Sequence, residues 1–498
     1  MALSVRGSTL KTLWKLNGFL KTFPACSIAV RLFGQPAPQT HPHLLNTGEV
    51  TPGISKEEFE FRRNKLANII SAHDAASTRG DESKNHLVII PGAPVTYMST
   101  DVPYVFRQNT DLLYLTGFQE PNSVLVLEVG RENKKPVYTS FLFVPKKDEK
   151  RELWEGLRSG VENAPKLTGI ENCQNIDDLE KYLESYLRRN RIFTLWCDYA
   201  RPVNRELHDG VISKFIQQQR HLNIYNPIRR VQGIRIKKSE AEIRLVKQST
   251  KIGAQALTEV MKYSYPGVNE AHLYAKMDFE CRVRGAEMLA YPPVVAGGNR
   301  ANTIHYISNN QLVHDSELVL MDAGCECHGY VSDVTRTWPV SGKFTEAQRE
   351  VYEAVLRVQK QCIQCCVAKS SLDSIFQYML KQIGLECQKL GILPRHLYGA
   401  ELSNQARMIC PHHIGHYLGM DVHDTSLMSC SLDLEPGMVV TIEPGIYLPE
   451  NNLSIPEKYR GMGVRIEDDV LITSHGPEVL TSLCPKEPDD IEALLKSR

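Results

Sequence analysis

Four carboxylates and one imidazole in the last third of the chain have the types and the order of ligands for a pair of divalent metal ions. Each lies in a short segment typical of a strand or a strand edge: Asp322, Asp333, His416, Glu443 and Glu467. Hard oxygen donors with one nitrogen favour manganese, iron, cobalt or zinc over copper or an iron–sulfur cluster. Two such ions about 3.5–4 Å apart can share a hydroxide that attacks an amide carbonyl. The five residues therefore predict hydrolytic chemistry.

The local sequence suggests how these residues meet. Asp322 and Asp333 lie on two predicted strands joined by a turn at Gly324–Gly329, which would bring both carboxylates to one point. Arg465 and Glu467 are two residues apart and share one face of a predicted strand. A single acid in such a place is more often a turn residue or half of an ion pair. An ordered series of five in apolar surroundings is much harder to obtain by chance.

Other histidines flank the ligand motifs. His412 lies four residues before His416, His423 lies seven after it, and His305 is followed by Tyr306. Each could be a structural histidine with satisfied hydrogen bonds. Their places beside the ligand motifs favour contact with a substrate instead.

The remaining histidines and cysteines predict no further metal site. His328 and His413 are expected to be structural or exposed to solvent. The 13 cysteines are scattered, which does not suggest a disulfide framework. The C-x-x-C within Cys362–Cys366 lies in a helical pattern without a second pair at zinc-finger spacing, which favours buried free thiols. So many cysteines fit a reducing compartment.

Residues 230–485 resemble the metallopeptidases of the pita-bread fold, which include aminopeptidase P, prolidase and methionine aminopeptidase. The resemblance rests on the ordered series of five ligands and implies that they bind two metal ions. In this assignment Asp322 chelates one ion, and Asp333 and Glu467 bridge or bind both. His416 binds the other ion, and Glu443 is a bridging-side ligand that can relay a proton.

The first half of the chain carries a second resemblance. The segments Pro103–Asp111 and Tyr114–Pro121 strongly resemble aminopeptidase P rather than prolidase, and so does Arg151–Gly156. Together the two resemblances cover about residues 55–485. The chain is thus identified as a member of the aminopeptidase P family, and its basic leader points to the mitochondrial branch of that family.

The resemblance also implies contacts between distant parts of the protein. Trp154 is expected to reach towards the active site of a neighbouring subunit in a homodimer. Asp101 sits where the family has an acid that pairs with the motif arginine, here Arg465. Glu467 is the alternative partner of this arginine.

The family implies a dinuclear-metal aminopeptidase that releases the N-terminal residue from peptides, preferably those with proline at position two. Manganese is implied by resemblance, and cobalt, iron or zinc also fit the donors. The catalytic residues are expected to be His412, His423 and Glu443. The substrate is expected to contact His305, Tyr306, His412, His423, Tyr447, Arg465 and Trp154.

Specific roles follow from the chemistry of the bond before proline, a tertiary amide without an N–H. Glu443 would pass a proton from the nucleophile to the leaving nitrogen, and His423 would stabilise the oxyanion. His305 and Tyr447 would accept the proline ring. The free amino group would be held near Asp322.

Other functions remain open for such a sequence. A prolidase-type dipeptidase or a methionine aminopeptidase would use the same ligands on the same fold. A pita-bread module that has lost catalysis and binds protein partners is a further alternative, although such modules usually lack the metal ligands.

The first 48 residues contain no acid but several lysines and arginines, with hydroxyl residues and leucines at helical spacing. This pattern is typical of a mitochondrial transit peptide, with a disordered basic tail or a secretory signal as alternatives. It predicts a matrix enzyme whose products include trimmed N-termini of imported proteins, and a cytoplasmic form where the leader is absent.

The composition excludes several partners. Lys and Arg together number 58, as do Asp and Glu, so no global field favours nucleic acid. The chain has no uninterrupted apolar run of 18 residues, so no membrane span is expected.

The 498 residues predict a leader and two domains. After residues 1–48 and a linker or extended arm over Gly34–Gly53, strands alternate with helices over 55–226, which indicates an α/β domain. A capping box at Ser239 opens the first long helix of an α+β domain over 230–498, whose strands carry the metal ligands. Its other predicted helices are Glu270–Gly285 and two between Thr345 and Gly391.

Overall fold

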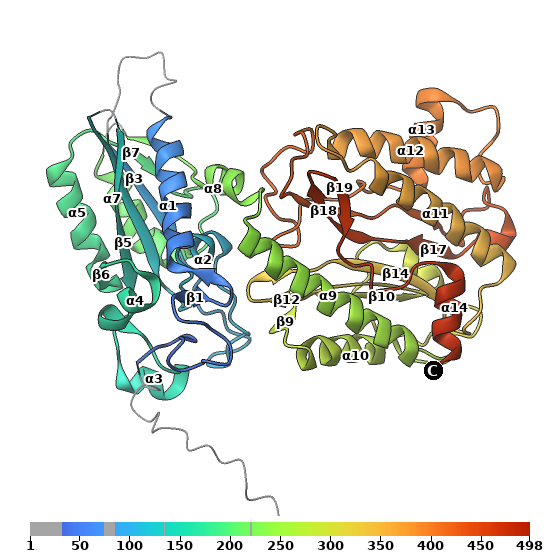
Figure 1. Cartoon of the computed structure of the whole chain (residues 1–498), viewed down its shortest axis with the longest axis horizontal. Helices are drawn as coiled ribbons and strands as arrows, with labels where there is room; N and C mark the ends of the chain where they lie inside the picture. The colour runs from blue at the N-terminus through green and yellow to red at the C-terminus, as the bar shows by residue number, and fades with distance from the viewer. Residues whose placement is uncertain (1–31, 74–84, 134, 220–221) are drawn as a thin grey trace, which may run out of the picture.

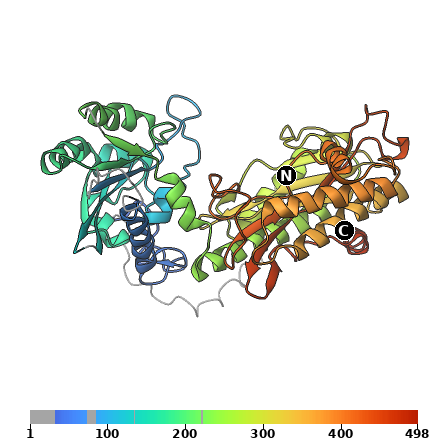
Figure 2. The same ribbon diagram turned by 90° about the horizontal axis from the view of Figure 1, so that it is seen from above.

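The computed structural model describes residues 32–73, 85–133, 135–219 and 222–498. Two bodies are joined by helix α8 (Ile228–Arg235), as Figures 1 and 2 show from two directions. The first body contains a mixed six-stranded sheet of order β6-β5-β4-β3-β7-β8. Its strands are β3 (His86–Pro91), β4 (Val124–Glu132), β5 (Lys135–Val144), β6 (Asn172–Asn175), β7 (Thr194–Trp196) and β8 (Asn223–Tyr225).

Helices cover both faces of this sheet. Along β3, Val88 and Ile90 belong to the core under α1, whereas Leu87 and Ile89 belong to the core under α5. This alternation is the period of a pleated strand buried on both sides. The helices are α1 (Lys56–Ser71), α2 (Thr110–Thr116), α3 (Glu149–Glu155), α4 (Gly160–Thr168), α5 (Leu179–Arg189), α6 (Arg205–Leu207) and α7 (Ser213–Gln217). The expected α/β architecture is confirmed.

The segment before residue 54 is packed, which corrects its interpretation as a linker or extended arm. Phe33, Ala37 and Leu45 are buried, and the first and second of these join the core of the N-terminal domain. The Gln35 side chain donates to the Gly117 carbonyl at 3.1 Å. Short strands β1 (Glu49–Thr51) and β2 (Ile54–Ser55) follow. The ordered domain thus begins well before residue 55. The leader is predicted over residues 1–48, and residues 1–31 of it lie outside the described residues.

The second body encloses small antiparallel sheets between layers of helices, with α9 and α10 on one side and α11 and α12 on the other (Figure 1). The sheets are β10-β11-β14, β13-β12-β9, β15-β18-β19 and β16-β17. The strands are β9 (Met288–Leu289), β10 (Val294–Gly297), β11 (Leu318–Ala323), β12 (Cys325–Cys327), β13 (Tyr330–Val331), β14 (Val334–Pro339), β15 (Val439–Ile442), β16 (Gly445–Leu448), β17 (Met462–Arg465), β18 (Asp468–Thr473) and β19 (Gly476–Val479). The expected α+β architecture is confirmed.

Capping boxes start the long helices where the sequence places them. Ser239 and Thr345 each accept from the backbone three residues on, while Glu242 and Gln348 accept from the two cap residues in return. Helix α13, which lies near α12, was not anticipated. The helices are α9 (Glu240–Tyr263), α10 (Glu270–Val283), α11 (Glu346–Gln364), α12 (Leu372–Lys389), α13 (Gly399–Ile409) and α14 (Pro488–Lys496).

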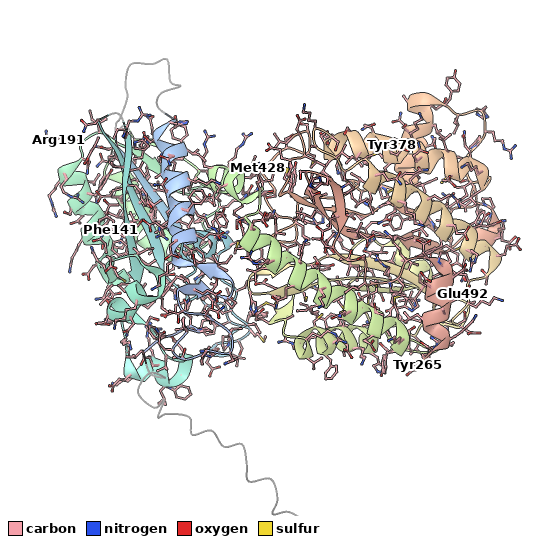
Figure 3. The ribbon with its side chains drawn as sticks, viewed as in Figure 1. Phe141, Arg191, Tyr265, Tyr378, Met428 and Glu492 are labelled. Carbon is pink, nitrogen blue, oxygen red and sulfur yellow. The ribbon has the colours of Figure 1, made fainter. Side chains whose placement is uncertain are left out.

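Charged side chains tie the two bodies together. Arg235, at the end of α8, is buried and donates to Asp111 of α2 at 2.6 Å and to Asp421 at 2.9 Å, and it also contacts Asp424. The loop beyond Asp424 reaches the same junction, because the Leu427 amide donates to a side chain of α8; the adjacent Met428 is labelled near the junction in Figure 3. Among the described helices, none has the length and apolar character needed to cross a membrane.

Candidate metal centre

A cavity of about 1000 Å³ lies in the C-terminal domain beside the domain junction. All five predicted metal ligands line it, together with His305, His412, His423 and Arg465. Arg107 of the N-terminal domain completes one wall. The structure thus brings together residues spread over more than 150 positions of the chain.

Strand pairing positions the carboxylates. Asp322 lies in β11 opposite Thr335 of β14, and Asp333 comes directly before β14. The chain must pass very close to itself here, since a Cβ on Gly324 would lie 1.7 Å from the Ser332 carbonyl oxygen. Only glycine permits this approach. The predicted turn therefore has a steric reason to contain glycine at this position.

The histidine loop is attached to β15 by backbone bonds. The Thr441 amide donates to the His416 carbonyl at 2.9 Å, and the His416 amide donates to the Thr441 hydroxyl at 3.1 Å. A Cβ on Gly415 would lie 1.9 Å from the Thr441 carbonyl oxygen. Glu443 follows immediately after β15, so the same strand end presents both the histidine and the acid.

The ligand atoms converge on a small volume. His416 Nε2 lies 3.4 Å from Asp333 Oδ2 and 3.6 Å from Glu443 Oε1. One ligand atom each of Asp333, His416 and Glu467 lies within 4.8 Å of the others. Asp322 joins the group through the Tyr291 hydroxyl, which lies 2.6 Å from Asp322 Oδ1 and also contacts Asp333. The predicted ligand set is therefore assembled in space.

Burial and mutual repulsion disfavour the ionised forms of the acids in this group. Burial, together with the neighbouring carboxylates, raises the pKa of Asp333 and of Glu467. Burial likewise raises the pKa of Glu443 to about 7, although the charges of His416 and Arg465 oppose the change. For His416 burial lowers the pKa, but the hydrogen bond to Asp333 and the adjacent acids raise it to about 9. Such a concentration of buried acids is relieved by cations.

Two expected pairings of Arg465 are wrong. The guanidinium lies 2.6 Å from Asp322 Oδ2 rather than beside Asp101, which is exposed on the N-terminal domain. Glu467 accepts a hydrogen bond from the Thr335 hydroxyl at 2.6 Å instead of pairing with the arginine. Asp322 is the nearer acid because β11 and β17 lie side by side, and that adjacency cannot be inferred from spacing along the chain.

The predicted substrate residues are placed unequally. His305, His412 and His423 line the cavity, and the ring of His423 packs edge-on against His416 with 4.5 Å between centroids. Tyr447 lies directly behind the wall, where its hydroxyl bonds His412 and Arg465. Tyr306 lies outside the lining and donates to Glu270 at 2.9 Å.

Trp154 stands apart from the cavity in this single chain. It lies on α3 of the N-terminal domain with 87% of its surface exposed. Its expected contact with a neighbouring subunit stays a prediction.

Sequence reasoning missed three supporting residues. Tyr291 bridges two ligands, Thr335 orients Glu467, and the buried Asp469 accepts from the Asp333 amide at 3.0 Å. Tyr291 begins the segment that leads to His305. Its nearness to this histidine in the sequence was the only feature that could have pointed to a role for Tyr291. When a hydroxyl or an acid supports a ligand from another strand, no fixed spacing in the sequence relates the two residues. Such a partner therefore cannot be found from the sequence alone.

Comparisons with known proteins agree with this geometry. Residues 244–474 match the model of metallopeptidase family M24, and residues 59–196 match the aminopeptidase P N-terminal domain. The chain is 47% identical to Xaa-Pro aminopeptidase 3 of Homo sapiens over 95% of this chain and 93% of the relative. It is 40% identical to the mitochondrial intermediate cleaving peptidase 55 of Arabidopsis thaliana over 94% of this chain and 88% of the relative.

Solved structures show the same fold. Icp55 from Saccharomyces cerevisiae has a TM-score of 0.78 at 34% identity, covering 91% of this chain and all of the other. Proline aminopeptidase P II from Yersinia pestis has a TM-score of 0.79 at 33% identity, covering 89% of this chain and all of the other. The chain therefore belongs to metallopeptidase family M24, and within it to the aminopeptidase P enzymes with a pita-bread catalytic domain.

Proposed function

We propose that this protein is a dinuclear-metal aminopeptidase that releases the N-terminal residue from peptides, preferably those with proline at position two. One observation carries the proposal: four carboxylates and one imidazole meet in a single cavity that is also lined by four further histidines. The names of the relatives, Xaa-Pro aminopeptidase 3 and intermediate cleaving peptidase 55, point to the same chemistry.

The donors suit two divalent ions. Asp322, Asp333, His416, Glu443 and Glu467 would hold them. An oxygen-rich set with one imidazole fits manganese first, while cobalt, iron and zinc also match. When bound, the ions would lower the pKa of a shared water and polarise the scissile carbonyl. Metal binding would also neutralise the buried acids whose pKa values burial raises.

Glu443 is suited to move the proton. In the metal-free protein burial raises the pKa of this acid to about 7. A carboxylate beside the nucleophile can accept a proton and pass it on. It would take the proton of the nucleophile and deliver it to the leaving proline nitrogen. That nitrogen must be protonated to leave, because a secondary amine anion is a poor leaving group.

The histidines have distinct roles. His412 Nδ1 donates to the His413 carbonyl at 2.8 Å, so Nε2 accepts from the Tyr447 hydroxyl at 2.9 Å. Arg465 donates to that same hydroxyl, and burial lowers the pKa of His412 to about 4. His412 is therefore a neutral, fully bonded wall residue. His423 has a pKa lowered by burial and would offer a neutral N–H to the oxyanion.

The cavity also provides an apolar surface for the proline ring. Ile304, Ile307 and Val422 line it beside His305. A pyrrolidine ring has no N–H to satisfy, so an apolar wall costs it nothing. The free amino group would lie near Asp322, whose two oxygens are already held by Tyr291 and Arg465.

A digest of a tripeptide library tests the proposal. The metal-depleted protein is reloaded with manganese, cobalt, iron or zinc, and the products are identified by mass spectrometry. Release of the first residue from X-Pro-Z, with much slower cleavage of X-Ala-Z, is expected. Preference for X-Pro dipeptides would favour a prolidase instead, and preference for N-terminal methionine a methionine aminopeptidase. Purified protein that takes up no divalent metal would favour the inactive binding module.

We further propose that the enzyme works in the mitochondrial matrix on new N-termini of imported proteins. The basic, acid-free leader and the mitochondrial relatives support this, and a cytoplasmic form is expected where the leader is missing. Tagged full-length and leaderless chains, followed by cell fractionation, test the location. The N-termini of matrix proteins in cells without the enzyme test the substrates.

A homodimer is the proposed assembly. Leu153 and Trp154 of α3 are 80% and 87% exposed, which is unusual for large apolar side chains side by side. Light scattering of the wild type and of Trp154→Ala tests this proposal. A monomeric wild type would reject it.

A further inference from the structure

His413, which the peptidase chemistry does not use, is held as metal-bound histidines are held. Its Nδ1 lies 3.0 Å from the Gly415 carbonyl oxygen, and its ring stacks on Phe376 with 4.5 Å between centroids. A carbonyl oxygen can only accept, so Nδ1 carries the proton and Nε2 of the neutral ring carries a lone pair. A backbone carbonyl that fixes the tautomer in this way is the usual support of a metal-ligating imidazole.

That lone pair faces another acceptor. His413 Nε2 lies 3.3 Å from Asp373 Oδ1. Two acceptors at this distance repel unless a proton or a cation lies between them. Two ligands on one tetrahedral zinc, with bonds of about 2.0–2.1 Å, are themselves about 3.3 Å apart.

Cys430 supplies a third donor. One ligand atom each of Asp373, His413 and Cys430 lies within 4.8 Å of the others. Backbone bonds already hold these segments together, since the Asp373 amide donates to the Cys430 carbonyl at 3.0 Å. The Leu434 amide likewise donates to the Ser370 carbonyl at 2.6 Å, next to the start of α12. The three donors therefore come from segments that the backbone already holds together.

We propose that Asp373, His413 and Cys430 bind one thiophilic divalent cation, with zinc as the expected ion, at the rim of the substrate cavity. This site is separate from the dinuclear centre and contains a thiolate, which the dinuclear centre lacks. The cation replaces the thiol proton, which is released to solvent, so Cys–SH and Zn²⁺ give a zinc thiolate and H⁺. Three protein ligands leave the fourth position for water.

An occupied site obstructs the peptide. His413 and Cys430 line the same cavity as the five catalytic ligands, so the cation and its water stand where a substrate passes. Zinc at this rim therefore inhibits cleavage. The binding stands independently of the proposed peptidase function, whereas the inhibition rests on it.

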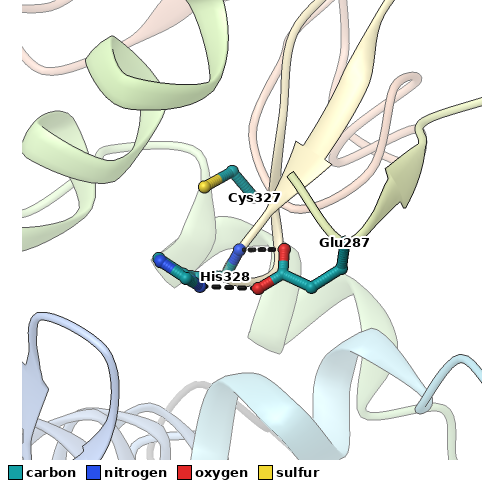
Figure 4. A group of neighbouring side chains, drawn as sticks. All are labelled: Glu287, Cys327 and His328. Atoms are coloured by element: carbon teal, nitrogen blue, oxygen red, sulfur yellow. Dashed lines mark hydrogen bonds and ion pairs between the residues drawn. The ribbon is translucent and has the colours of Figure 1, made fainter. Parts of the chain in front are cut away.

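A second group of potential ligands, Glu287, Cys327 and His328, does not have these features. Both carboxylate oxygens of Glu287 accept hydrogen bonds from His328, at 2.8 Å from its amide and 2.6 Å from Nδ1 (Figure 4). The Cys327 thiol takes no part in these two hydrogen bonds. In this group the carboxylate accepts from the proton-bearing nitrogen of the imidazole instead of facing its lone pair, and both carboxylate oxygens are already hydrogen-bonded.

Cobalt spectroscopy tests the proposal without relying on activity. The full chain loaded with manganese is titrated with Co²⁺, and the near-ultraviolet thiolate-to-cobalt band is recorded. One equivalent of this band is expected in the wild type, and it is expected to vanish in Cys430→Ser. The matched controls are Cys365→Ser, another partly exposed thiol, and Cys327→Ser, and both should keep the band. A wild type without the band, or a band lost in Cys327→Ser but kept in Cys430→Ser, overturns the site.

The inhibition is measured separately. Tripeptide cleavage under saturating manganese is followed as zinc is added, and each rate is divided by the rate of the same variant without added zinc. The zinc concentration for half inhibition should rise at least tenfold in Cys430→Ser and stay unchanged in Cys365→Ser. Equal sensitivity of all three proteins overturns the inhibitory role. A rim thiolate band with no cleavage of any peptide would instead reject the proposed function.

Discussion

Arg465 and Asp322 form a buried ion pair, with Nη2 of the arginine 2.6 Å from Oδ2 of the aspartate. The same guanidinium donates to the Tyr447 hydroxyl at 2.8 Å and to the Thr335 hydroxyl at 3.2 Å. Thr335 in turn donates to Glu467 at 2.6 Å. One arginine therefore fixes two of the proposed metal ligands, the first directly and the second through a hydroxyl.

Replacement of this arginine by lysine is expected to lower kcat/KM about 10–100-fold, the usual cost of losing a partner that orients metal ligands. The guanidinium of Arg465 donates to Asp322, Thr335 and Tyr447 at once. The single ammonium group of a lysine cannot reach all three acceptors. Steady-state kinetics and the manganese dissociation constant of Arg465→Lys are the measurements. Arg244→Lys, on the exposed face of α9, is the matched control and should behave as wild type. Equal kinetics in the two variants would remove the positioning role.

Removal of Asp333 or Glu467, the acids proposed to bind both ions, is expected to abolish turnover while the fold remains. Asp333→Ala and Glu467→Ala each leave too few donors for two ions, so bound metal should fall together with the rate. Metal content by mass spectrometry and far-ultraviolet circular dichroism provide the two readouts. Asp433→Asn, which changes an exposed acid, is the control. Near-wild-type rates in either alanine variant with metal supplied would refute the two-metal centre.

Stabilisation by metal should grow with pH. In the metal-free protein the pKa of His416 is raised to about 9, while an unfolded histidine titrates near about 6.5. The stability that this ion-paired histidine contributes is complete below about pH 6.5 and is lost as the pH rises through about 9. Manganese needs the neutral imidazole, so its binding strengthens over the same interval.

The gap in Tm between manganese-loaded and metal-free protein should therefore widen from pH 6.5 to pH 9. Scanning calorimetry in matched buffers measures it. The pKa of Glu443, raised to about 7, adds to the effect at the lower end of the interval. A gap that stays constant or narrows would contradict the prediction.

Glycine 415 is expected to tolerate no side chain. In Gly415→Ala the new Cβ would meet the Thr441 carbonyl oxygen at 1.9 Å, which must push the His416 loop away from β15. Overpacking of this kind costs about 1–3 kcal/mol, and the displaced histidine should also weaken metal binding. Gly233→Ala in α8 is the control, since nothing lies within 4 Å of its Cβ and alanine favours a helix. Denaturant unfolding and metal titration should separate the two variants.

The packed N-terminal segment limits how much of the predicted leader can be deleted without loss of stability. Deletion of residues 1–31 leaves Phe33, Ala37 and Leu45 in place, whereas deletion of 1–48 removes all three buried side chains. The longer deletion should lose several kcal/mol of stability at about 1.5–3 kcal/mol per large side chain. Thermal unfolding of both purified chains measures this. Equal melting temperatures would mean that the segment contributes nothing to the core.

The sequence strongly indicates which residues are the proposed metal ligands. It gives little indication of the residues that hydrogen-bond these ligands. Asp322, Asp333 and Glu467 are recognisable because they form an ordered series of acids within predicted strands. The link from Arg465 to Asp322 could not be foreseen, because it depends on which strands become neighbours after folding. Tyr291 and Asp469 were invisible for the same reason.

Regular elements were easier to anticipate than irregular ones. The capping box at Ser239 follows a local rule and appears in the structure. The segment from Gly34 to Gly53 was misjudged because proline, histidine and threonine are typical of linkers. It packs through a few apolar side chains spaced without a helical or strand period, which local patterns do not reveal.

Arg107 donates to Glu326, to the Met420 carbonyl and to Asp421, while lining the cavity of the other domain. Part of the reaction chamber is therefore encoded in the first half of the gene and the ligands in the second. Loss of Arg107 would leave Glu326 and Asp421 of the other domain without this partner. A variant without this arginine would keep all five proposed metal ligands and still lack part of the cavity wall.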